Sequence, residues 1–153
     1  KAIGALGGYV AGSQELIDTI VNDARPFVYT TALPPSIAAA AHAAIKLITQ
    51  EPDRRVRLWS HAAFLRSQLS QAGFQVSPGK SPILPVIIGA AATAVEMSDA
   101  LLDSGVLVPA IRPPTVPTGT ARLRVTPMAT HTDADLAAAV DAFIAAGQAT
   151  RQL

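Results

Sequence analysis

The chain has 153 residues, enough for one domain or for a small domain joined to part of another; half are hydrophobic and 15% are charged, which excludes an intrinsically disordered protein. Twelve basic against eleven acidic side chains leave a formal net charge of +1, so the composition gives no electrostatic argument for binding nucleic acid or a membrane surface. The absence of cysteine excludes disulfides, zinc–thiolate sites and thiol catalysis, and it fits a reducing cytosol.

The apolar runs are too short for a membrane-spanning helix. The longest ones, residues 37–45 and 83–92, fall well below the roughly 20 apolar residues that such a helix needs. The first residues also lack the order of a signal peptide, with its basic start, long apolar centre and small-residue cleavage site. We therefore expect a soluble, cytoplasmic protein.

Residues 1–24 predict a glycine-rich loop followed by a helix. Four glycines at the start indicate a tight loop that runs into a short strand at residues 9–11. Ser13 is a suitable N-cap, and apolar residues recur at helical spacing as far as about Ala24. Pro26 is expected to end this helix, because the residue before a proline avoids the helical conformation.

Residues 27–50 predict an extended segment and a second helix. The sequence FVYTTAL at 27–33 is rich in β-branched and aromatic residues, which favour a strand. Pro34 and Pro35 suit the first turn of a helix, where the missing N–H has no partner in any case. The alanine-rich sequence after them extends this helix to about Gln50.

The rest of the chain predicts a long helix and then short strands that alternate with helices. The long helix begins at Pro52–Asp53 and ends before Gly73. Strands are expected at residues 83–88, 106–111 and 122–126, and helices at residues 91–102 and from Thr132 onward.

These elements predict an α/β fold in two parts. Residues 52–153 form a small domain of mainly antiparallel sheet covered by helices, because short strands joined by loops or single helices rarely support a larger parallel sheet. Residues 1–51 contain one expected strand and helices with no sheet to join, so we interpret them as the tail of a large domain with an interdomain helix. The chain as a whole is interpreted as the carboxyl-terminal part of a larger protein.

The histidines and one arginine cluster give little support for a site. His42, His61 and His131 lie on different expected elements without metal-site spacing, so we interpret them as structural or solvent-facing and expect no metal. The basic residues within 54–57 (RRVR) are interpreted as a solvated helix face rather than an anion-binding patch.

The loop between the last two expected strands has a more unusual composition. Residues 111–124 read IRPPTVPTGTARLR, in which prolines and threonines stiffen a connection that begins at Arg112. A rigid loop that presents a guanidinium suits a carboxylate, because the planar fork forms two parallel charge-assisted hydrogen bonds. The pattern alone equally favours a proline-rich connection with an incidental arginine.

Three segments together resemble the carboxyl-terminal part of the α-oxoamine synthases, a family of fold-type I enzymes that depend on pyridoxal 5′-phosphate (PLP). They are KAIGALGGYVAGS at 1–13, FVYTTALPP at 27–35 and IRPPTVPTGTARLRVTPMATHT at 111–132, in the family's order and with about its spacing. The run from Arg112 to Pro117 is most similar to the member that condenses L-alanine with a pimeloyl thioester, of CoA or of a carrier protein, in biotin synthesis.

The resemblance implies roles for five residues. Lys1 corresponds to the catalytic lysine that forms a Schiff base with PLP and then acts as general base. Thr30 and Thr31 correspond to the segment that reaches the PLP phosphate of the opposite subunit, which implies a homodimer with shared active sites. Arg112 corresponds to the residue that binds the amino-acid carboxylate, and Thr115 to a neighbouring substrate contact.

Other readings of the same residues stay open. Glycine C-acetyltransferase, 5-aminolevulinate synthase and serine palmitoyltransferase share the lysine and the fold but use other amino acids and acyl donors. A non-catalytic α/β module for binding or dimerisation would carry no covalent cofactor. Family members are much longer than this chain, and the residues that contact the PLP ring lie outside the sequence.

Overall fold

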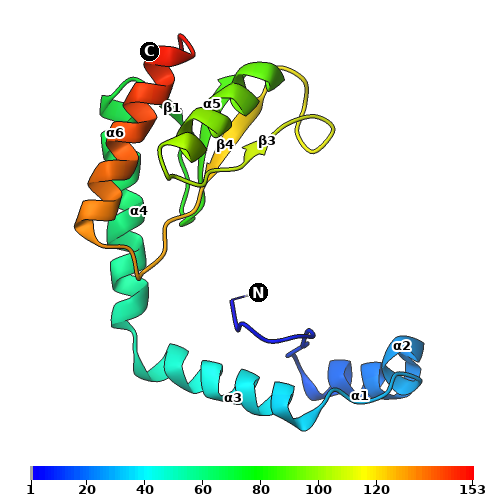
Figure 1. Ribbon diagram of the computed structural model, residues 1–153. Helices are drawn as coiled ribbons and strands as arrows, with labels where there is room; N and C mark the ends of the chain where they lie inside the picture. The colour runs from blue at the N-terminus through cyan, green and yellow to red at the C-terminus, as the bar shows by residue number, and fades with distance from the viewer. Residues whose placement is uncertain (1) are drawn as a thin grey trace. The chain divides into compact units, whose positions relative to one another are not determined.

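The computed structural model describes residues 2–153 and separates them into two compact units. The first unit ends at Pro52 and the second comprises Asp53–Leu153. The described residues of the first unit contain helices and loops only, whereas the second unit combines helices with a sheet (Figure 1).

The first unit contains three helices: α1 (Gln14–Asp23), α2 (Arg25–Val28) and α3 (Pro35–Gln50). Ser13 caps α1 as predicted, since its side-chain oxygen accepts a hydrogen bond from the backbone N–H of Leu16 at 3.4 Å. The start of α3 at Pro35 and its end at Gln50 are also as the sequence indicates.

The strands predicted in the first unit do not form. Residues 9–11 lie in a segment without regular structure, and residues 27–33 begin in the short helix α2 and continue as a turn and loop. A strand is stabilised by a neighbouring strand, and none is present among the described residues of this unit. Pro26 lies in the first turn of α2, where proline is tolerated, so it separates two helices rather than introducing an extended segment.

The helices of the first unit bury none of their residues. Large apolar side chains are exposed on them instead, among them Leu16, Phe27, Ile45, Leu47 and Ile48. Apolar side chains exposed in this density are typical of a surface that another segment covers. This is consistent with the predicted tail of a large domain, which stays a prediction.

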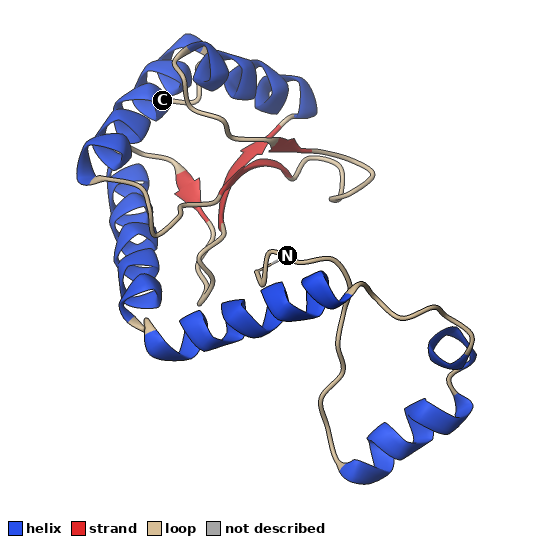
Figure 2. Cartoon of the chain, turned by 60° about the horizontal axis from the view of Figure 1, so that its bottom comes forward, coloured by secondary structure: helices blue, strands red, loops and turns tan. Residues whose placement is uncertain are grey.

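The second unit has seven elements. They are α4 (Asp53–Gln71), β1 (Gln75–Val76), β2 (Leu84–Gly89), α5 (Ala91–Asp103), β3 (Ala110–Ile111), β4 (Ala121–Val125) and α6 (Asp133–Ala149). The strands form one sheet in the order β1-β2-β4-β3, and every neighbouring pair is antiparallel (Figure 2). The mainly antiparallel sheet covered by helices is confirmed.

Two strands differ from the predicted ones. β1, which pairs with Ile87 and Val86 of β2, was not predicted, because two residues are too few to show an alternating pattern. The strand expected at residues 106–111 pairs only at Ala110–Ile111, because the Val108 carbonyl accepts from the Ser98 hydroxyl at 2.7 Å and Pro109 has no N–H to donate to a ladder.

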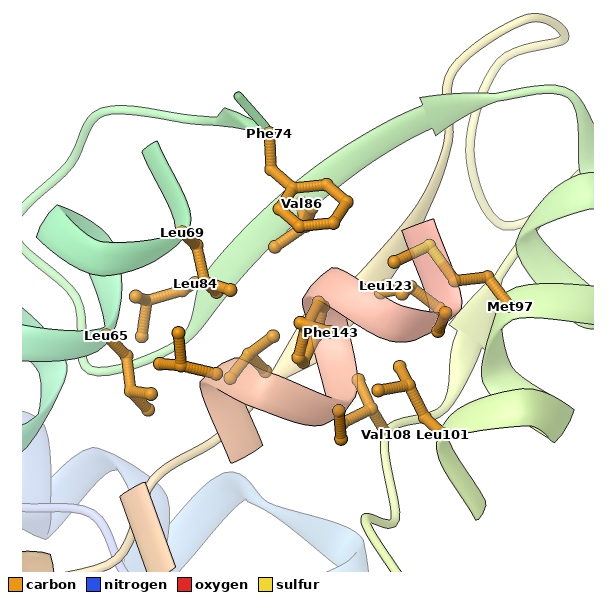
Figure 3. Close-up of a cluster of buried hydrophobic side chains, with 14 of the residues drawn as sticks. Leu65, Leu69, Phe74, Leu84, Val86, Met97, Leu101, Val108, Leu123 and Phe143 are labelled. Atoms are coloured by element: carbon orange, nitrogen blue, oxygen red, sulfur yellow. The ribbon is translucent and has the colours of Figure 1, made fainter. Parts of the chain in front are cut away.

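The core of the second unit lies between the sheet and its three helices. Leu84, Val86 and Leu123 of the strands are fully buried together with Leu69 of α4, Met97 and Leu101 of α5 and Phe143 of α6 (Figure 3). The rings of Phe74 and Phe143 pack edge to face, with centroids 5.7 Å apart and planes at 81°. Arg122 and Arg124 lie on the opposite face of β4, as its alternating sequence predicts.

None of the helices within residues 2–153 combines the length and the apolar character needed to cross a membrane.

Candidate functional site

The loop after β3 presents Arg112 to solvent. Arg112 directly follows Ile111, which pairs with Arg122 of β4, so the sheet fixes the point at which the loop begins. The Arg112 side chain is exposed, and within residues 2–153 its guanidinium has no hydrogen bond or ion pair. All its N–H donors are therefore available to an anion.

A tight turn brings Thr115 next to Arg112. The backbone N–H of Thr115 donates to the Arg112 carbonyl at 3.1 Å, around a cis peptide bond between Pro113 and Pro114. The Thr115 side chain is exposed like that of Arg112. The two residues assigned to substrate by resemblance thus lie in one turn.

Arg122 stabilises the other end of this loop through hydrogen bonds to Thr120. Its Nε donates to the Thr120 carbonyl and its terminal nitrogen donates to the Thr120 hydroxyl, both at 3.0 Å. The same hydroxyl donates to the Pro117 carbonyl at 2.7 Å. The sequence predicts only a strand at residues 122–126 and gives no role to Arg122; the signal was an arginine two residues after a threonine at the end of a proline-rich loop.

Thr30 and Thr31 differ in whether their hydroxyl protons already have an acceptor. Both side chains are exposed in the segment that follows α2. The Thr30 hydroxyl donates to the carbonyl of Pro26, so its proton is already used. The Thr31 hydroxyl has no partner in the described part of the chain. Thr31 is therefore the better donor to a phosphate.

Lys1 lies outside the described residues, but the glycine-rich segment after it encloses a pocket. This pocket of about 380 Å³ is lined by Ile3, residues 5–9, Leu33, Ile37, Ala38 and Ala41. Gly7 has a φ of +105°, and a Cβ there would lie 2.7 Å from the Cδ1 atom of Leu33. The positive φ favours glycine, because a side chain there would strain the backbone, and it would also displace the flexible end of Leu33.

The structure therefore brings the predicted residues together in two pairs. Thr30 and Thr31 are adjacent in the first unit, and Arg112 and Thr115 share a turn in the second. The donor chemistry of these residues fits a phosphorylated cofactor and a carboxylate substrate, since a free hydroxyl and a free guanidinium both donate to anions.

Two of the three histidines form hydrogen bonds with the backbone of Met128. His61 is only 8% exposed, and its Nδ1 lies 2.9 Å from the Met128 carbonyl, to which it donates. His131 Nδ1 accepts from the backbone N–H of Met128 at 3.3 Å. Among residues 2–153 no three His, Cys, Asp or Glu side chains are grouped so that they could hold a metal ion.

Comparison with known proteins relates the chain to PLP enzymes. Residues 1–143 match the family model described as aminotransferase class I and II. The 8-amino-7-oxononanoate synthase of Anaeromyxobacter dehalogenans (strain 2CP-C) is 48% identical over 146 residues, which cover 95% of this chain and 36% of that protein. The synthase of the same name from Hahella chejuensis is 50% identical over 136 residues, covering 89% and 34%. The chain thus spans about a third of the length of these curated relatives.

Solved structures give the same fold. Serine palmitoyltransferase from S. paucimobilis, with a bound PLP–myriocin aldimine, superposes with a TM-score of 0.92 at 34% identity, over 99% of this chain and 38% of that one. An 8-amino-7-oxononanoate synthase from Francisella tularensis superposes with a TM-score of 0.84 at 27% identity, over 99% and 44%.

Proposed function

The chain belongs to the aminotransferase class I and II family, and we propose that it is the carboxyl-terminal part of a PLP-dependent acyltransferase that condenses L-alanine with a pimeloyl thioester. The products are 8-amino-7-oxononanoate, CO2 and the free thiol of CoA or of the carrier protein, and the reaction serves biotin synthesis. One observation carries this proposal: curated relatives named for this reaction are 48% and 50% identical over almost the whole chain.

In this proposal Lys1 holds the cofactor and moves the proton of the substrate. PLP, when bound, supplies the electron sink for chemistry at the alanine Cα. Lys1 removes the Cα proton as general base and later returns a proton to the product. Thr31 donates its free hydroxyl to the cofactor phosphate, with Thr30 beside it in the same segment.

Arg112 and Thr115 position the amino acid. The Arg112 guanidinium binds the alanine carboxylate through two parallel hydrogen bonds and so holds the amino acid in one orientation. Support comes from the Arg112 guanidinium, which is exposed and has no partner among residues 2–153, and from the hydrogen bonds of Arg122 that hold the other end of its loop. Thr115, in the same turn, is the neighbouring polar contact.

We also place the enzyme in the cytoplasm as a homodimer with shared active sites. The threonines of one subunit then serve the cofactor bound by the other. The exposed apolar side chains of the first unit are consistent with further covering contacts in the assembly, and the lack of cysteine fits a reducing compartment.

The preference of the enzyme among amino acids and acyl donors tests the proposal. We would measure kcat/KM of the full-length protein for alanine, glycine and serine, each with pimeloyl-CoA, pimeloyl carrier protein and palmitoyl-CoA. We expect alanine with a pimeloyl donor to give the highest value. No turnover of any pair would favour a non-catalytic α/β module.

A second candidate is the serine palmitoyltransferase reaction of the same family. The 34% identity and TM-score of 0.92 to that enzyme from S. paucimobilis favour it. Since the higher identities are to relatives named for the alanine reaction, we rank it second. A highest kcat/KM for serine with palmitoyl-CoA would establish it instead.

A further inference from the structure

A surface pocket of about 580 Å³ lies in the second unit, between α4 and the loop that follows β1. Its volume is within the roughly 300–1,000 Å³ that is usual for small-molecule sites. One wall comes from α4, between Trp59 and Ser70, and the other from residues 79–81. No residue assigned above to substrate or cofactor lines it.

The α4 wall is one stripe of the helix. Trp59, Ala63, Arg66 and Ser70 recur at intervals of four, three and four residues, which places them on one helix face. Trp59 is 47% exposed, so much of its indole is open to a ligand. The small side chain of Ala63 leaves space between the indole and the arginine. A planar group can lie on this wall, against the indole.

The charged residues of the pocket are both basic. Arg66 is half-buried, and its guanidinium donates to the carbonyl of Ser77, a bond that joins the helix to the opposite loop and leaves the other N–H donors of the guanidinium available. Lys80 lies on that loop and is exposed. No acidic residue lines the pocket, so an anion there meets no carboxylate of the lining.

Two serines of the lining have protons to donate. The Ser67 oxygen accepts from the side-chain amide of Gln71 at 3.1 Å, and the Ser81 oxygen accepts from the backbone N–H of Ile83 at 3.1 Å. Neither hydroxyl donates to an acceptor within the described residues. The polar side chains of the pocket are thus arranged as hydrogen-bond donors, which suits a ligand rich in acceptors.

We propose that this pocket binds a ligand that combines a phosphate group with a planar ring, which is the chemistry of a purine nucleotide. The ring lies on Trp59, where base–indole stacking is favourable for any base. The phosphate accepts hydrogen bonds from Arg66, Lys80 and the serine hydroxyls. The ligand is either a free nucleotide or the nucleotide end of a CoA thioester, and the second source rests on the function proposed above.

Calorimetric titration of the full-length protein with ADP, with coenzyme A and with adenosine tests this without relying on turnover. We expect ADP to bind, and adenosine, which lacks phosphate, to bind much more weakly. Arg66→Gln and Lys80→Gln should each raise the Kd for ADP by about tenfold or more, since each removes a charge-assisted contact. Arg57→Gln is the matched control, because Arg57 is an exposed arginine of α4 outside the pocket.

The effect of these substitutions on coenzyme A binding distinguishes the two sources of the nucleotide. If the same substitutions also weaken coenzyme A, the pocket holds the nucleotide end of a thioester; if they weaken ADP alone, it holds a free nucleotide. The proposal is overturned if the wild-type protein does not bind ADP, or if both variants keep its Kd. Lys80 lies on an exposed loop, so Lys80→Gln decides the matter even if Arg66→Gln disturbs folding.

Discussion

The two arginines that flank the loop between β3 and β4 have different environments. Arg112 is exposed and unpartnered within the described residues, whereas Arg122 is half-buried and holds the backbone and hydroxyl of Thr120. Arg122 uses its Nε and one terminal nitrogen on Thr120, whereas none of the Arg112 N–H groups has a partner in the described residues. We therefore assign substrate binding to Arg112 and loop positioning to Arg122.

Replacing Arg112 should impair the use of alanine without affecting the cofactor. Arg112→Ala removes a charge-assisted interaction of about 1.5–3 kcal/mol, so kcat/KM for alanine should fall about 10- to 150-fold. Arg112→Lys should also be impaired, because an ammonium cannot form the bidentate contact. Steady-state kinetics and PLP absorbance measure the two effects.

The control for Arg112→Ala is a substitution at an exposed arginine of strand β4. Arg124→Ala, on β4, should keep both kinetics and PLP content. If Arg112→Ala retained wild-type alanine kinetics, or lost its PLP instead, the loop would be structural and the assignment wrong.

The two adjacent threonines should also differ. Thr31→Ala removes a hydroxyl with a free proton, so the Kd for PLP in the full-length protein should rise by about tenfold or more, as for a hydrogen bond to a charged group. Thr30→Ala should have a smaller effect, because the Thr30 hydroxyl donates to Pro26. Titration of the apoenzyme with PLP compares them, and a larger effect at Thr30 would refute this distinction.

Among the elements, α6 begins with a capping box that depends on pH. The Thr132 oxygen accepts from the backbone N–H of Asp135 at 3.2 Å, while the Asp135 carboxylate accepts from the backbone N–H and the hydroxyl of Thr132, both at 2.8 Å. The backbone hydrogen bond from Thr132, followed by the hydrogen bond from its hydroxyl, lowers the pKa of Asp135 below its ordinary value.

The sign of the pH effect follows from that direction. A carboxyl whose pKa is lower in the folded state stabilises the fold above its unfolded pKa of about 3.9, and this contribution is lost as the pH falls through the lowered folded value. The Tm of Asp135→Asn should therefore lie below that of the wild type at pH 7, and the gap should close as the solution is acidified toward and below the folded pKa.

Two further variants measure how much the capping residues of α6 contribute to stability. Thr132→Ala should lower stability by about 0.5–2 kcal/mol at neutral pH, the usual effect of losing an N-cap. Asp133→Asn, in the same first turn, removes a charge that is not part of the capping box and should have a smaller effect. An Asp135→Asn gap that stayed constant across the pH range would show that the carboxylate does not stabilise α6.

Elements with a local signal were predictable from sequence, and those that depend on distant partners were not. Local signals correctly located three helices: Ser13 before α1, Pro52–Asp53 and Gly73 around α4, and Thr132 before α6. Residues 27–33 have strand propensity but no strand to pair with, so part of the segment is helical.

The same distinction applies to the candidate site. Composition and resemblance identified Arg112, but its exposure and its contrast with Arg122 required the structure. Leu16, Phe27 and Ile45 stay exposed in the first unit, and what covers them in the proposed assembly depends on chain segments that neither the local sequence nor local folding specifies.

At the scale of the whole molecule, the proposed homodimer predicts complementation. A hybrid of one Lys1→Ala subunit and one Thr31→Ala subunit has one site in which both residues are intact and one in which both are replaced. Co-expressed and separately tagged subunits should therefore recover part of the activity that each variant alone lacks. Absence of recovery in purified hybrids would place Lys1 and Thr31 in the same subunit's site.

Reductive trapping shows whether Lys1 of this chain is the residue that binds PLP. The full-length holoenzyme would be reduced with borohydride, and its intact mass and the mass of the peptide containing Lys1 would be measured beside those of Lys1→Ala. We predict one pyridoxyl phosphate per chain, located on Lys1 and absent from the variant. An unmodified wild-type mass, or an adduct on another lysine, would contradict the account.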